Sequence, residues 1–248
     1  MLPLNIRSTP RPVTLSAPEP LLQRVGMIQV VRDDLMPGGT KARALSVLFD
    51  MEHREYVYAS PVQGYAQVAL AQCAKAAGCY AHIFCAERKL WHARTKEASD
   101  LGAIMHMLRP GYLSQLQAAA QAFVASQPEA KLLPFGLDDE AFLEALAEVG
   151  RAVARRLFVQ PPQVWSVAGS GVLSRALQRV WPEAEFHAVQ IGHAPNVGRA
   201  ILHRAPERFE DDAKLRPPFP SCANYDAKAW RFIEQHAVPD ALFWNVAK

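Results

Sequence analysis

The chain has 248 residues and is 50% hydrophobic, which is long enough for one large domain or for two lobes with separate cores. Lys and Arg number 27 against 24 Asp and Glu, a formal net charge of +3 that is too small by itself to indicate a nucleic-acid-binding protein. No apolar run approaches the roughly 20 residues of a membrane-spanning helix, and residues 1–15 lack the apolar centre of a signal peptide. We therefore expect a cytoplasmic protein with no membrane partner.

The four cysteines indicate no metal site. Cys73, Cys79, Cys85 and Cys222 form no CxxC pair and have no histidine nearby at zinc-ligand spacing, which is the pattern that a structural zinc site requires. We expect them to be buried, reduced thiols.

The middle of the chain alternates short β-rich runs with longer alanine-rich segments, which is the pattern of βα units that feed a parallel sheet. Glycine after a helical segment is typical of a helix C-cap, and Gly78 and Gly102 follow two of these segments. Strands are predicted at 55–59, 80–86, 103–108 and 131–136, and helices at 67–78, 94–102 and 113–126.

The second half of the chain begins with a long amphipathic helix at 139–157, with acidic residues early and basic residues late, as the helix dipole favours. Weaker signals separate the remaining elements. Strands are predicted at 163–168, 185–192 and 241–246, and helices at 176–181 and 226–237. The sequence thus predicts an α/β protein with mainly parallel sheets in two lobes, a larger one from 1–57 plus 141–248 and a smaller inserted one from 58–140.

Two stretches carry residues suited to chemistry. The segment AGSGVLS, 168–174, connects a predicted strand to a helix, so its backbone amides are placed to bind a phosphate. It matches neither the P-loop nor the GxGxxG pattern, and tight packing would also explain its small residues. Lys41 follows Gly38 and Gly39 between two apolar segments. Such a lysine is either a solvated side chain at a helix start or a desolvated nucleophile with a lowered pKa that can form a Schiff base.

The segment RDDLMPGGTKARAL, 32–45, favours the second interpretation because it resembles the lysine-bearing segment of a known family. This is the tryptophan-synthase-β-like, fold type II, pyridoxal-phosphate-dependent enzyme family, in particular its branch with aminocyclopropane-carboxylate deaminase and D-cysteine desulfhydrase. The resemblance implies pyridoxal 5'-phosphate as cofactor, bound to Lys41 as an internal aldimine in the larger lobe, and a homodimer. The matching residues are Arg32, Asp33, Asp34, Leu35, Gly38, Gly39, Lys41 and Arg43.

Two further segments resemble the family in the same order along the chain. Residues 63–78 resemble its substrate loop and following helix, with Tyr65 in place of the asparagine that contacts the cofactor ring. Gln63, Gly64 and Ala66 then stand at the substrate-binding positions, where the family's hydroxyl residues are missing. The glycine-rich loop would bind the cofactor phosphate through Gly169, Ser170, Gly171, Val172, Leu173 and Ser174, although Val172 and Leu173 depart from the family pattern.

Three other assignments concern single side chains. Asn245 is the nearest polar candidate for a residue beside the pyridine nitrogen, and Tyr225 is a candidate catalytic acid or base. A tyrosine that caps the core is the alternative for Tyr225. Asp33 and Asp34 are either a catalytic acid pair, or one caps the turn while the other pairs with Arg32 or Arg43.

The resemblance implies an enzyme of the lyase, deaminase or decarboxylase type that acts on an amino acid or amino-acid-like amine through a Schiff base of Lys41. The altered substrate loop leaves an alternative open, in which the amino acid is attached to thymidine in DNA and is decarboxylated, as in phage-type DNA hypermodification. A second alternative is a non-catalytic binding or scaffold protein derived from the same fold. A generic nucleotide-binding protein is disfavoured because no dinucleotide fingerprint is present.

Overall fold

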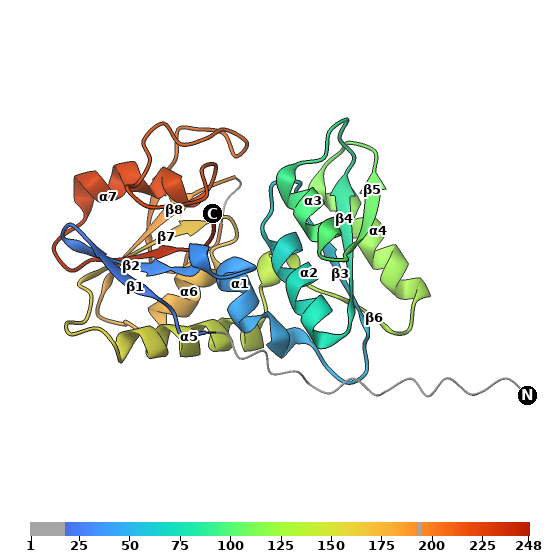
Figure 1. Ribbon diagram of the computed structural model, residues 1–248, viewed down its shortest axis with the longest axis horizontal. Helices are drawn as coiled ribbons and strands as arrows, with labels where there is room; N and C mark the ends of the chain where they lie inside the picture. Colours follow the sequence, from blue (N-terminus) through green and yellow to red (C-terminus); the bar gives the residue numbers. More distant parts are fainter. Residues whose placement is uncertain (1–17, 193–194) are drawn as a thin grey trace, which may run out of the picture.

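The computed structural model describes residues 18–192 and 195–248. The expectation about a signal peptide rests on residues outside these ranges. Two lobes lie side by side, each built on its own sheet (Figure 1). In the described part of the chain, no helix combines the length and the apolar character needed to cross a membrane.

The larger lobe contains a six-stranded sheet in the order β1-β2-β10-β7-β8-β9. Only the β1–β2 pair is antiparallel. Its strands are β1 (Leu22–Val25), β2 (Ile28–Arg32), β7 (Gln163–Ala168), β8 (Glu185–Gln190), β9 (Ile201–Arg204) and β10 (Leu242–Asn245). Its helices are α1 (Gly39–Ala44), α5 (Glu140–Ala154), α6 (Val172–Gln178) and α7 (Trp230–His236).

Helices cover both faces of this sheet, and the alternation of side chains along each strand explains why. Val30 points into a cluster with Trp230 and Ile233 of α7. Its neighbour Val31 points into a second cluster with Val153 of α5 and Leu177 of α6. In Figure 1, α7 accordingly lies above the sheet and α5 runs along its lower side.

The smaller lobe contains a four-stranded parallel sheet in the order β5-β4-β3-β6. It begins three residues before the predicted lobe boundary at position 58. Its strands are β3 (Glu55–Ala59), β4 (Tyr80–Ala86), β5 (Ile104–Leu108) and β6 (Ala130–Leu132), and its helices are α2 (Ala66–Ala77), α3 (Ala93–Asp100) and α4 (Leu113–Ser126). Gly78 ends α2 in the left-handed conformation, as predicted for a C-cap.

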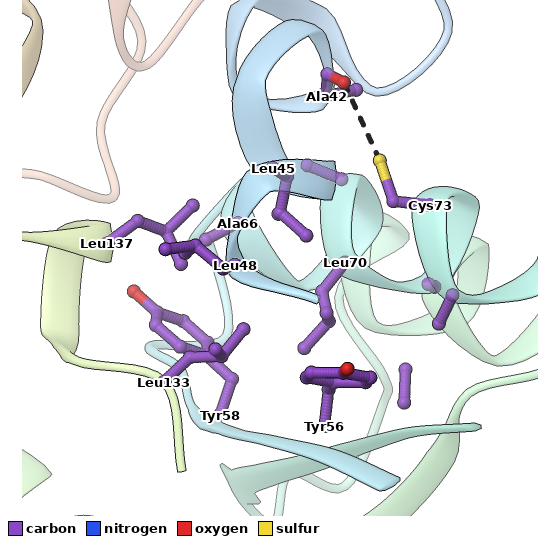
Figure 2. Close-up of a cluster of buried hydrophobic side chains, with 14 of the residues drawn as sticks. Ala42, Leu45, Leu48, Tyr56, Tyr58, Ala66, Leu70, Cys73, Leu133 and Leu137 are labelled. Carbon is purple, nitrogen blue, oxygen red and sulfur yellow. Dashed lines mark hydrogen bonds between the residues drawn. The ribbon is translucent and has the colours of Figure 1, made fainter. Parts of the chain in front are cut away.

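The core beneath α1 joins the two lobes. Leu45 and Leu48, which follow α1, pack against Tyr56 and Leu70 of the smaller lobe, as Figure 2 shows. The thiol of Cys73 on α2 lies 3.6 Å from the carbonyl oxygen of Ala42. The segment after Lys41 is therefore fixed between the lobes rather than exposed.

Some predicted elements differ from those observed, and strand β9 was missed. The helix predicted at 176–181 is α6, which begins four residues earlier, at Val172. The strand predicted at 131–136 ends at Leu132, because Pro134 has no amide hydrogen and Gly136 adopts a positive φ of 73°. The helix predicted at 226–237 begins as a 3-10 turn over Asp226–Ala229. Strand β9 was not predicted; Ile201 and Leu202 are 48% and 39% exposed, so it lacks a buried apolar pattern.

Candidate active site

Lys41 projects from the turn that joins β2 to α1. Gly38 and Gly39 both have positive φ, 78° and 63°, which glycine adopts without steric cost. A Cβ atom at Gly39 would lie 2.4 Å from the carbonyl oxygen of Val246, and the amide of Thr40 donates to that same oxygen at 3.1 Å. The glycine pair is therefore required because the turn lies directly against the chain after β10.

The carboxylate of Asp33 stabilises this turn through three hydrogen bonds. It accepts hydrogen bonds from the Arg43 guanidinium at 2.7 Å, from the Thr40 hydroxyl at 2.8 Å and from the Trp244 indole at 3.0 Å. The side chain of Asp33 is fully buried and that of Arg43 is 3% exposed. Asp33 therefore positions the residues on both sides of Lys41.

The carboxylate oxygens of Asp34 are also engaged in hydrogen bonds within the protein. Its two carboxylate oxygens accept from Nε and Nη2 of Arg32, both at 2.8 Å, and one also accepts from the Asn245 amide at 2.8 Å. Neither Asp33 nor Asp34 lines the cavity described below. The alternative of a catalytic acid pair is therefore not supported, and both carboxylates are structural.

The structure does not bring Asn245 to the position predicted for it. Its amide nitrogen donates to Asp34 and to the Pro220 carbonyl at 2.9 Å, and its oxygen accepts from the Ser221 hydroxyl at 2.7 Å. The side chain is fully buried and is not part of the cavity wall. Its hydrogen-bonding groups are thus used within the larger lobe, and it has none free for a cofactor.

A cavity of about 280 Å³ opens between the lobes beside Lys41. Its wall comes from the carboxyl ends of strands in both sheets, where ligands bind in open α/β folds. Apolar groups such as Leu113, Phe135, Ile191 and Phe209 form much of the remaining wall. The predicted site residues that line it are Lys41, Gln63, Gly64, Tyr65, Ala66, Gly169, Ser170 and Tyr225.

The amino group of Lys41 is uncommitted. Among the residues that the structure describes, none forms a hydrogen bond or ion pair with it. Burial lowers the pKa of Lys41, and the nearby charge of Asp226 opposes that shift. A partly desolvated lysine without a partner deprotonates more readily than an ordinary lysine and is then a nucleophile.

The glycine-rich loop lines the same cavity as this lysine. Gly171 has a φ of 88°, and a Cβ atom there would lie 1.9 Å from the Asn196 carbonyl oxygen. The backbone amides of Ser170 and Gly171 have no hydrogen-bond acceptor among the described residues. Together with Val172 and Leu173, these residues line a smaller hollow that also contacts Lys41.

Two residues of this region have different surroundings from those predicted. The Ser174 hydroxyl donates to the Val197 carbonyl at 3.1 Å and is buried outside both hollows. The amide of Gly169 donates to the Tyr225 hydroxyl at 2.8 Å. Ser174 and the Gly169 amide therefore stabilise the loop and are not free to bind a phosphate.

Tyr225 lines the cavity next to this loop. Burial is the main cause that raises the pKa of its phenol, so the group is neutral at ordinary pH and its hydroxyl hydrogen remains available to a ligand. The structure thus places Tyr225 within reach of the cavity while the Gly169 amide fixes its orientation.

Asp226 was missed by the sequence analysis. It is fully buried, and one carboxylate oxygen accepts from the Ala247 amide at 3.1 Å. The other oxygen, Oδ1, is buried without any partner among the described residues. Burial raises the pKa of Asp226 well above its usual value. Its position beside Tyr225 in the sequence was the only available signal, because burial of an acidic residue is not visible in its neighbours.

The predicted substrate loop, 63–66, forms the wall of the cavity on the smaller lobe. The guanidinium of Arg94 lies 4.3 Å above the ring of Tyr65 and also donates to the backbone carbonyl of Lys248. Arg94 of α3 therefore connects the smaller lobe to the end of the larger lobe beside the cavity. The loop supplies Gln63 as a polar side chain in place of a hydroxyl cluster.

By sequence, no protein-family description and no curated protein matches this chain. By structure, it is similar to an ACC deaminase homologue, with a TM-score of 0.79 and 13% identity over 92% of this chain and 89% of that one. It is also similar to threonine deaminase isoform 2 from Solanum lycopersicum, with a TM-score of 0.71 and 13% identity over 93% and 79%. Escherichia coli diaminopropionate ammonia lyase aligns with a TM-score of 0.65 and 16% identity over 89% and 77%.

These alignments cover nearly all of the described chain and both of its lobes. The identities are low, so the similarity concerns the fold. The chain has the fold of the fold type II pyridoxal-phosphate enzymes, which confirms the fold class that its lysine-bearing segment predicted.

Proposed function

We propose that the protein is a pyridoxal-phosphate-dependent enzyme of the deaminase or lyase type that acts on the amine of an amino acid or a related compound. The observation that carries this proposal is Lys41, a partly desolvated lysine without a partner that faces a cavity between the lobes. The ACC deaminase homologue, threonine deaminase and diaminopropionate ammonia lyase, which share the fold, support the deaminase or lyase type.

The residues around the cavity fit this cofactor. Lys41 would bind its aldehyde carbon, and the free amides of Ser170 and Gly171 would bind its phosphate. Asp226 is not itself part of the cavity wall, but Tyr225 beside it and Ala247, whose amide donates to it, are. On this proposal its unpartnered oxygen would accept a hydrogen bond from the pyridine nitrogen. A buried carboxyl oxygen without a hydrogen-bond partner is costly, so a ligand that donates to Oδ1 accounts for a feature that the protein alone leaves unexplained.

Bound pyridoxal phosphate supplies an electron sink for the electrons of a bond broken at the substrate Cα. The chain's own groups provide the proton transfers. The amine of Lys41 would be the base that holds or returns a proton at the substrate Cα. The hydroxyl of Tyr225, fixed by the Gly169 amide, is a second proton donor at the cavity wall.

The side chains of the cavity wall also determine which substrate can bind and how it is held. Leu113, Phe135 and Phe209 make part of the wall apolar, and a bound ligand that displaces water from it would experience stronger electrostatic interactions. Gln63 and the free backbone groups of the substrate loop would bind the substrate carboxylate in place of hydroxyl side chains. Loss of ammonia is the reaction favoured here, and decarboxylation is the alternative if that carboxylate is held weakly.

The test is attachment of the cofactor. Purified protein would be mixed with pyridoxal phosphate, its visible absorption recorded, the adduct reduced with borohydride and the labelled lysine identified by peptide mass mapping. We expect a visible band and a single label on Lys41. Lys41→Ala should abolish both, whereas Lys75→Ala, at an exposed lysine of α2, should change neither.

Labelling spread over several exposed lysines, with no visible band, would contradict the proposal. In that case the chain is a binding or scaffold protein that keeps the fold without its cofactor chemistry. Turnover of free amino acids by the loaded protein, followed by ammonia or carbon dioxide release, would then distinguish the deaminase or lyase reaction from decarboxylation.

A further inference from the structure

Two neighbouring loops of the smaller lobe carry exposed cationic and aromatic side chains. They follow β4 and β5, which are adjacent parallel strands, so the loops leave the sheet at the same edge. Trp91 is 45% exposed and Tyr112 is 82% exposed. We call this set the basic rim: Arg88, Lys89, Trp91, Arg109 and Tyr112.

The cations of the basic rim are unpaired. Within residues 18–192 and 195–248, the side chains of Arg88, Lys89 and Arg109 form no hydrogen bond or ion pair. Glu87 is the single carboxylate on the two loops, 87–92 and 109–112. The loops therefore present three positive charges against one negative charge.

Several exposed arginines of the larger lobe are paired with carboxylates. On α5 and α6 and beside them, Arg151 contacts Glu144 at 2.8 Å, and Arg179 contacts Glu140 at 2.7 Å. Such pairs are the usual arrangement on a surface where both signs alternate. The basic rim differs from that arrangement, because its free cations have only solvent or a ligand as partner.

The basic rim is continuous with the cavity. Tyr112 directly precedes Leu113, which forms part of the cavity wall. At the other loop, Arg94 lies in the first turn of α3 and stacks on Tyr65, another residue of the wall. Both loops of the rim are therefore followed directly by residues that form or contact the cavity wall.

The larger lobe does not extend this positive surface. Its segment at 205–216 supplies Phe209 to the cavity wall, but it carries Glu207, Glu210, Asp211 and Asp212 beside its own basic residues. An anionic ligand is therefore attracted to the smaller lobe and not to this segment.

We propose that the basic rim binds single-stranded nucleic acid and presents an amine carried on one of its bases to the cavity. This inference rests on the proposed function, because it names the substrate class of the same site. Phosphates pair with Arg88, Lys89 and Arg109, while Trp91 and Tyr112 have exposed ring faces on which bases stack. An acidic polypeptide would satisfy the cations but would leave both rings without a stacking partner.

The test is binding of a fluorescein-labelled single-stranded DNA of about 20 nucleotides, measured by fluorescence anisotropy with the full-length, cofactor-loaded protein. We expect binding that weakens linearly in log–log form as salt rises. The double variant Arg88→Glu/Lys89→Glu should weaken binding at least about tenfold and lower the salt slope by about 0.7 for each phosphate that is no longer bound. Tyr112→Ala should weaken binding by about tenfold with an unchanged salt slope.

Arg155→Glu is the matched control. Arg155 is also exposed and unpaired among the described residues, but it lies at the end of α5 on the larger lobe, so its reversal should leave the affinity unchanged. No binding by the wild-type protein at low salt, or equal losses in the rim and control variants, would overturn the inference. Equal affinity for polyglutamate would overturn the assignment to nucleic acid.

Failure of this inference is separable from failure of the proposed function. Cofactor attachment to Lys41 is measured in the same samples by absorption. Rim variants that retain the visible band but lose DNA affinity support the inference. Lys41→Ala should lose the visible band and keep its DNA affinity. A wild-type protein that shows the band but has no DNA affinity would refute nucleic-acid binding by the basic rim and leave the proposed function intact.

Discussion

Removing the carboxylate of Asp33 should destabilise the protein more than any surface change. Asp33→Ala leaves the Arg43 guanidinium, whose side chain is 3% exposed, with the backbone carbonyl of Pro18 as its remaining acceptor among the described residues. It also removes the acceptor used by Thr40 and Trp244. Breaking a buried ion pair on one side costs about 3 to 5 kcal/mol. With a urea dependence of about 3 kcal/mol per molar, the unfolding midpoint should fall by about 1 to 2 M.

Urea unfolding followed by circular dichroism would measure this shift, and two comparisons make it specific. Arg24→Ala removes an exposed pair with Asp240, whose side chains are 54% and 38% exposed, and should cost less than about 1 kcal/mol. Arg43→Met added to Asp33→Ala should restore part of the stability, because no unpaired charge then remains buried. A midpoint for Asp33→Ala equal to that of Arg24→Ala would refute the reasoning.

Three further predictions concern titration and chemistry. Asp226→Asn should leave cofactor attachment to Lys41 intact and lower kcat about a hundredfold or more, so wild-type turnover would argue against its role. The rate of cofactor attachment should rise with pH through a midpoint below 10.5, because burial lowers the pKa of Lys41; a midpoint at or above that value would contradict the assignment. Burial, together with the charge of His106, lowers the pKa of His82 to about 4 from 6.5, so the unfolded chain binds the proton first and stability falls as pH drops from 6.5 to 4. The stability advantage of wild type over His82→Phe should therefore shrink by about 3 kcal/mol between pH 7 and 4 in urea titrations, and a constant difference would disprove this.

The features that the sequence predicted well are those specified by local patterns. The β-rich and alanine-rich runs correspond to parallel strands and helices, since burial on one face imposes a period on each segment. The turn before Lys41 was recognisable because Gly38 and Gly39 have a conformation that other residues avoid. Of the eight predicted residues around the cavity, seven came from segments that resemble a known family, and Tyr225 was assigned singly.

The features that it did not predict depend on contacts between distant segments. Asp226 has a buried carboxyl group with an unpartnered oxygen because the chain after β10 packs against it. Nothing in the sequence next to Asp226 indicates that burial. Asn245 appeared free in the sequence, but its amide faces Asp34, more than two hundred residues earlier. Ser174 likewise uses its hydroxyl on Val197. A polar residue near a motif thus reveals its role only when its partners are known.

The pairing of β2 with β10 also determines when the protein can become functional during its synthesis. Val30 aligns with Phe243 and Arg32 with Asn245, so one of the first strands made lies between β1 and one of the last. The smaller sheet uses only residues 55–132, whose contacts are available much earlier on the ribosome. Until the chain beyond position 241 has emerged, β2 has an open edge and the turn before Lys41 has nothing to lie against. A nascent chain therefore carries its nucleophile without a site in which to use it until β10 has been made.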